Sequence, residues 1–154
     1  MYNISFSWLL QEEKKTDPRI TMSILILIAT RHSMKFPKSA AYDPEFVRAN
    51  MMGPNSMKTL EELAGYMNFK PGMRVLDLGC GTGLTSIFLA REFGVTVFAT
   101  DLWISATENY ERFLSMGVAD KVIPIHAEAH DLPYAEAYFD AAVSIDAFHY
   151  FGHE

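Results

Sequence analysis

Two kinds of apolar pattern alternate along the chain after residue 72. Short runs rich in β-branched and aromatic residues are typical of strands buried in a parallel sheet. They predict four strands, over residues 73–78, 95–100, 122–125 and 139–145. Between them, residues 84–93 and 103–116 repeat apolar residues at helical spacing, and Gly94 and Gly117 follow as helix ends. The alternation predicts an α/β fold with a doubly wound parallel sheet of about four strands.

Two N-terminal helices are predicted before the first strand. Asp43 is placed to cap the first helix and Pro44 to begin it, because the missing N–H of proline costs nothing there. That helix is expected to run through residues 46–51 and to be broken at Gly53 and Pro54. The second helix has a predicted apolar face of Met57, Leu60, Leu63, Ala64 and Met67. This amphipathic pattern indicates a helix that packs on the core.

The helix expected over residues 103–116 is amphipathic as well. Glu108, Glu111 and Arg112 lie on its polar side. Its apolar side is predicted to consist of Trp103, Ala106, Tyr110, Phe113 and Leu114. We therefore expect Tyr110 and Phe113 to be core residues.

Residues 1–33 have poor periodicity and form a predicted N-terminal lead, so the predicted domain is 34–154. A short helix at residues 7–15 and a strand at 24–30 are the best interpretation of the lead. Its apolar run MSILILIA is far shorter than the roughly 20 residues that span a membrane. A mixed-charge cluster precedes this run, which disfavours a secretory signal. We expect no membrane span.

Composition restricts the partners of the chain. The 154 residues carry a formal net charge of −6 with no basic cluster, which argues against nucleic acid, whose backbone is bound by clustered Lys and Arg. The single cysteine, Cys80, cannot form an internal disulfide, as expected in the reducing cytosol. These features predict a cytoplasmic protein without a metal-binding cysteine cluster.

A glycine-rich loop joins the first predicted strand to the next helix in the sequence VLDLGCGTG, residues 75–83. Its glycines are Gly79, Gly81 and Gly83, which allow a sharp turn and close approach of a ligand. The acidic side chain of Asp77 precedes them. A carboxylate there would repel a pyrophosphate and attract an α-amino group, and Leu84 stands where a dinucleotide fingerprint needs its third glycine. The loop therefore fits the amino-acid end of S-adenosylmethionine.

Two further strand ends carry matching chemistry. Asp101 follows the second strand about 20 residues beyond the loop, where an acidic side chain can accept hydrogen bonds from ribose hydroxyls. After the third strand, Glu128 and the backbone of Ala129 can pair with adenine, and Leu102 and Leu132 could sandwich the base. Because the carboxyl ends of parallel strands meet at one edge of a sheet, these residues predict a single crevice.

These residues resemble the class I S-adenosylmethionine-dependent methyltransferases from about Asp43 to the end of the chain. In that family VLDLGCGTG is the first motif, the acid at Asp101 binds ribose, and A-E-x-x-D-L-P-Y, here residues 127–134, is the adenine segment. The resemblance implies a Rossmann-like fold, S-adenosylmethionine as the cofactor, and a role of Cys80 through its backbone. Within the family, the sequence is most similar to the small-molecule methyltransferases, so the resemblance implies a small-molecule acceptor.

The chain departs from the family after the fourth strand, where family members continue through three more strands that help to form the acceptor site. The sequence thus predicts an incomplete sheet that carries the donor-binding half and is inactive alone. His149 follows the fourth strand with Asp146, near the place where the family holds residues facing the methyl group, and is the candidate general base. His126 and His130 lack a third ligand, so no metal site is predicted.

Two alternatives remain open at this point. One is a dinucleotide oxidoreductase, which Asp77 and Leu84 disfavour. The other is a non-catalytic Rossmann-like module whose open edge at the fourth strand pairs with another copy or another chain. A comparison of S-adenosylhomocysteine binding with NAD binding tests the first alternative. Concentration-dependent sedimentation tests the second.

Overall fold

The computed structural model describes residues 35–152, and the account below concerns the compact unit Lys38–Glu154 as far as residue 152. The helix and strand predicted at residues 7–15 and 24–30 lie outside the described residues. The boundary between a lead and a domain at residues 33 and 34 stays a prediction. No helix among the described residues is long and apolar enough to cross a membrane.

Four strands form one parallel sheet in the order β3-β2-β1-β4. They are β1 (Arg74–Leu78), β2 (Thr96–Asp101), β3 (Val122–His126) and β4 (Ala141–Val143). The order places β1 between β2 and β4, so the direction of winding reverses beside β1, where ligands of such sheets bind. The predicted Rossmann-like parallel sheet is confirmed.

β4 is shorter than the strand predicted over residues 139–145. It pairs with β1 through three residues only. Phe139 instead packs its ring on Phe98 at 5.4 Å between centroids, and the carboxylate of Asp140 accepts a hydrogen bond from the backbone N–H of Arg74 at 2.7 Å. The apolar run therefore contains a turn into the sheet as well as a strand.

The helices are η1 (Ser39–Ala41), α3 (Pro44–Asn50), α4 (Ser56–Ala64), α5 (Leu84–Phe93), α6 (Ala106–Ser115) and η2 (Phe148–Tyr150). As predicted, Asp43 caps α3 and Pro44 begins it. Asn55 caps α4 by accepting from the N–H of Lys58. The predicted apolar face of this helix is only partly right, because Met57 and Leu60 are fully buried whereas Leu63 and Met67 are exposed.

The helix predicted over residues 103–116 begins later than expected. Ser105 and Glu108 form a capping box, which fixes the first helical residue at Ala106. Trp103 lies before the helix and is 64% exposed. The prediction that Tyr110 is a core residue is wrong, since it is 46% exposed, whereas Phe113 is fully buried as predicted.

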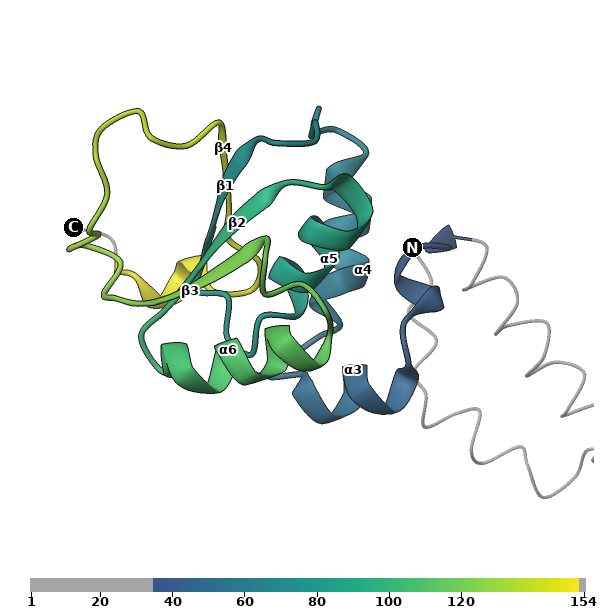
Figure 1. The fold of residues 1–154 in the computed structure, drawn as a ribbon. Helices are drawn as coiled ribbons and strands as arrows, with labels where there is room; N and C mark the ends of the chain where they lie inside the picture. The colour runs from purple at the N-terminus through teal and green to yellow at the C-terminus, as the bar shows by residue number, and fades with distance from the viewer. Residues whose placement is uncertain (1–34, 153–154) are drawn as a thin grey trace, which may run out of the picture. The chain divides into compact units, whose positions relative to one another are not determined.

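The core lies on one face of the sheet, between the strands and helices α4, α5 and α6 (Figure 1). Strand residues alternate between faces, and the buried ones on this side are Val75, Val97, Ala99 and Val122. On the opposite face Phe98 contacts an aromatic cluster from the loop before β4, formed by Tyr134, Tyr138 and Phe139. The helical face thus holds β1 and β2 rigidly, and with them the loops at their carboxyl ends.

Candidate functional site

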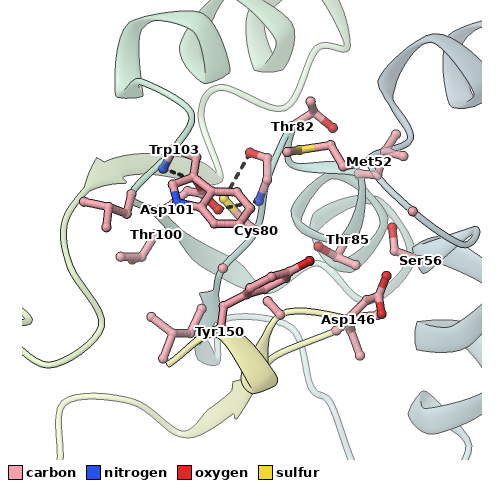
Figure 2. A pocket seen from close by; sticks show the side chains of 18 of the residues that line it. Met52, Ser56, Cys80, Thr82, Thr85, Thr100, Asp101, Trp103, Asp146 and Tyr150 are labelled. Carbon is pink, nitrogen blue, oxygen red and sulfur yellow. Dashed lines mark hydrogen bonds between the residues drawn. The ribbon is translucent and has the colours of Figure 1, made fainter. Parts of the chain in front are cut away.

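A cavity of about 200 Å³ opens at the carboxyl ends of the strands (Figure 2). The loops after β1, β2, β3 and β4 all contribute to it, together with the loop between α3 and α4. The predicted site residues that line it are Gly79, Cys80, Gly81, Asp101, Leu102, Glu128 and Ala129. The predicted residues that do not line it are Asp77, Gly83, Leu132 and His149. The strand ends therefore converge as expected.

Several lining residues were not among the predicted site residues. Trp103 and Tyr150 face each other with ring centroids 4.9 Å apart, and Met52 reaches the cavity from the loop between α3 and α4. Asp146 lines it as well. The position of Asp146 directly after the fourth predicted strand was the one usable signal in the sequence, whereas nothing in the sequence indicates that Met52 folds back over the glycine loop.

The glycine loop is closed on its outer side by Met52. Gly81 has φ +55°, and a Cβ on it would lie 2.8 Å from the sulfur of Met52. The hydroxyl of Thr82 donates to the carbonyl of Asn50 at the end of α3. The loop therefore needs glycine partly because the protein's own residue 52 approaches it closely.

Asp101 links the loops that follow β1 and β2 at the carboxyl ends of these strands. One carboxylate oxygen accepts a hydrogen bond from the N–H of Gly81 at 2.7 Å. The other accepts from the N–H groups of Trp103 at 2.8 Å and Ile104 at 2.9 Å. A carboxylate has about four lone-pair positions, so about one remains for a ligand. Asp101 is 9% exposed at the cavity wall.

Asp77 points away from the cavity and into the core. Its neighbour in β1, Leu76, faces the other side of the sheet, so the carboxylate of Asp77 lies against α5. One of its oxygens accepts hydrogen bonds from the hydroxyls of Thr85 and Ser86, both at 2.6 Å. The other oxygen is buried and has no partner in the described part of the chain. Burial raises the pKa of Asp77 to about 6, although the two hydroxyls oppose this.

This raised pKa predicts the effect of Asp77→Asn. The folded chain binds the proton more tightly than the unfolded chain, so the stabilisation is complete below about pH 4 and is lost as the pH rises through about 6. The two-unit difference corresponds to about 2 to 3 kcal/mol at pH 7. An Asn oxygen can keep both hydroxyl bonds, so the variant should be about 1 to 2 kcal/mol more stable than the parent at pH 7.

Urea unfolding of both proteins at pH 4 and pH 7, followed by circular dichroism, measures this difference. The parent should lose stability between the two pH values more than the Asp77→Asn variant does. A variant that is less stable than the parent at pH 7 would show that the ionised carboxylate is instead favourable in the fold.

The adenine segment lies at the outer edge of the cavity. Glu128 is exposed, and hydrogen bonds from the side chain and backbone of His130 lower the pKa of its carboxyl. The ring of His126 bonds the carbonyl of Leu102 at 2.8 Å, which holds the loops after β2 and β3 together. Leu132 lies outside the cavity.

His149 is exposed and packs its ring against Tyr150 at 4.0 Å between centroids, and it does not line the cavity. Its predicted role as a base stays a prediction. No group of three or more potential ligands in the described residues could hold a metal ion. Burial raises the pKa of Cys80 well above its ordinary value, as expected of an unreactive thiol.

The charged residues that line the cavity in the described part of the chain all carry the same sign. Its acidic lining residues are Asp101, Glu128 and Asp146, and no Lys, Arg or His lines it within residues 35–152. A crevice at the switch point of a parallel sheet, lined by a glycine loop and three carboxylates, suits a cationic rather than a phosphorylated ligand.

Comparison with known proteins defines the family. The family model described as a methyltransferase domain matches residues 75–154, about half of the chain. The chain belongs to this family of methyltransferase domains, and it resembles part of a class I S-adenosylmethionine-dependent methyltransferase.

Three similar proteins illustrate the range of this family. O-methyltransferase resE of Aspergillus sclerotiorum is 31% identical over 61% of this chain and 39% of its own length. The glycine/sarcosine/dimethylglycine N-methyltransferase of Actinopolyspora halophila is 32% identical over 60% of this chain and 17% of its own length. An S-adenosylmethionine-dependent methyltransferase from Thiobacillus denitrificans, solved with S-adenosylhomocysteine, superposes with a TM-score of 0.52 at 28% identity over 66% of this chain and 40% of that one. The chain thus spans less than half of each.

Proposed function

We propose that the chain binds S-adenosylmethionine in the cavity at the strand ends and serves methyl transfer to a small-molecule acceptor. The observation that carries the proposal is the set of three cavity carboxylates without a basic lining residue in the described chain. S-adenosylmethionine carries a sulfonium and an ammonium group, which this lining attracts, whereas the pyrophosphate of a dinucleotide would be repelled. The cofactor supplies a methyl group on an already activated leaving group.

Each predicted site residue has a proposed role. Asp101 offers its remaining lone pair to one ribose hydroxyl, because three positions are already used by backbone N–H groups. Glu128 and the backbone of Ala129 pair with adenine, and Leu102 forms one wall of the base site. The backbone at Gly79, Cys80 and Gly81 receives the amino-acid end. Leu132 could reach the base only through movement of its loop.

We propose that Asp77 acts on this site through the electrostatic field of its carboxylate. Its partnerless oxygen leaves a negative charge behind the glycine loop, which favours an ammonium group bound in front of it. Gly83 shapes the entry of the loop into α5. His149 would serve as a base only for an acceptor that must lose a proton.

The chain's own contribution to the reaction is alignment of the donor and exclusion of water. We propose that residues 34–154 are the donor-binding domain and that the 154-residue chain binds the cofactor without turnover. We further propose a cytoplasmic protein that does not bind nucleic acid. The exposed edge of β4 would let the chain associate with another copy.

Calorimetric titration of the chain tests the proposal. S-adenosylhomocysteine should bind, and NAD and ATP should produce no saturable heat at equal concentrations. Binding of NAD in preference to S-adenosylhomocysteine would overturn the assignment of the cavity. Methyl transfer by the 154-residue chain alone would overturn the proposed lack of turnover.

A further inference from the structure

Asp146 differs from the other two cavity carboxylates in its lack of hydrogen-bonding partners among the described residues. It follows β4 and lines the cavity, where Figure 2 draws it near Ser56 and Thr85. Within residues 35–152 its side chain makes no hydrogen bond and no ion pair. The other two cavity carboxylates differ, since Asp101 accepts three backbone hydrogen bonds and Glu128 is bonded to His130.

The backbone holds Asp146 in an uncommon conformation. Its φ is +58°, in the left-handed region that costs a residue with a side chain about 1 kcal/mol or more. Asn and Asp tolerate this region better than most residues, but the usual reason is a local hydrogen bond, which Asp146 lacks. The conformation presents the carboxylate to the cavity instead.

The segment between α3 and α4 leaves room for this carboxylate. A Cβ on Gly53 would lie 2.5 Å from the nearer carboxylate oxygen of Asp146, so no larger residue fits at position 53 without displacing it. Ser56, at the start of α4, lines the same cavity and is drawn near Asp146 in Figure 2. The aromatic rings of Trp103 and Tyr150 line the same cavity and offer faces to a cation.

We propose that Asp146 binds the cationic amino group of the methyl acceptor, so that the acceptors of this site are amines rather than neutral alcohols. This inference rests on the proposed function. Its basis is an unpaired carboxylate in a cavity with aromatic walls and no positive side chain among the described residues to neutralise it. The proposal concerns binding and leaves the reacting atom unassigned.

The ammonium group of the cofactor is the other cation that could meet Asp146. The two sources are separated by Asp146→Asn, which removes the charge and keeps the shape. If the acceptor is the source, the variant should bind S-adenosylhomocysteine within about twofold of the parent, because that ligand carries the ammonium of the cofactor but no acceptor amine. A weakening of S-adenosylhomocysteine equal to that of the amine would overturn the proposal.

The test measures binding of benzylamine and benzyl alcohol to the chain saturated with S-adenosylhomocysteine. These probes differ in one functional group. The parent should prefer the amine by about threefold to fivefold, the size expected of a charge pair at an exposed position such as that of Asp146, and the preference should shrink as salt is added. In Asp146→Asn the preference should fall to about one.

Two more variants make the outcome decisive. Gly53→Ala keeps the charge but displaces the carboxylate, so it should also reduce the amine preference. Asp120→Asn makes the same chemical change in an exposed loop at the opposite end of the sheet and should change nothing. Equal binding of benzylamine and benzyl alcohol by the parent would overturn the inference, and so would an unchanged amine preference in Asp146→Asn. Failure of the parent to bind S-adenosylhomocysteine would instead overturn the proposed function itself.

Discussion

Asp101→Asn is expected to weaken S-adenosylhomocysteine binding by about tenfold to a hundredfold and to destabilise the fold by about 1 to 3 kcal/mol. The carbonyl oxygen of the Asn can still accept from the N–H groups of Trp103 and Ile104. Its NH₂ group then faces the N–H of Gly81, so that two donors meet and the bond to the glycine loop is lost. The variant therefore loses both the ribose acceptor and the link between β2 and the loop.

Calorimetry with S-adenosylhomocysteine and urea unfolding measure the two effects separately. Asp120→Asn is the matched control, because it makes the same change in an exposed residue that lies away from the cavity. A folded Asp101→Asn chain with the affinity of the parent would show that this carboxylate does not contact the nucleoside.

The sequence predicted best where glycine and proline fix the backbone. α5 begins and ends at the predicted residues because Gly83 and Gly94 adopt left-handed conformations at its two ends. Pro44 and Asp43 similarly placed α3. The predicted parallel pairing of successive strands is seen for β1 with β2 and for β2 with β3, which short helical crossovers connect.

Prediction failed where several apolar residues compete for one core. Helical periodicity placed Trp103 and Tyr110 on the same buried face as Phe113, but the capping box at Ser105 makes the helix begin at Ala106, after Trp103. Periodicity records which side chains could face inward, and it does not tell which of them the sheet has room to cover. Tyr110 consequently remains exposed beside the buried Phe113.

The site was predictable in position more than in the orientation of its groups. Asp101, Glu128 and the glycine loop meet at one cavity, as strand ends of a parallel sheet must. The alternation of side chains along β1 could not show that Asp77 would be bonded by Thr85 and Ser86, because that depends on the turn of α5 above it. The left-handed backbone of Asp146 was likewise not predicted from the sequence.

Gly83→Ala is expected to destabilise the chain by about 3 to 4 kcal/mol, the largest stability effect among these variants. Gly83 has φ +79°, and a Cβ there would lie 2.4 Å from the ring of Phe113. Phe113 is fully buried between α6 and the sheet, so its ring cannot move aside without opening the core. A methyl group on residue 83 of the glycine loop would therefore occupy space that the Phe113 ring of the core already fills.

Gly117→Ala separates the two causes of this loss. Gly117 has φ +66°, but a Cβ there would meet nothing within 4 Å, so the variant should lose only the backbone contribution of about 1 kcal/mol. In a Phe113→Leu background the cost of Gly83→Ala should fall by about 1 to 2 kcal/mol, because the shorter side chain leaves room for the methyl group. Urea unfolding of the double-mutant cycle measures this coupling. Equal losses for Gly83→Ala and Gly117→Ala, with no coupling to residue 113, would mean that the glycine loop does not bear on the core.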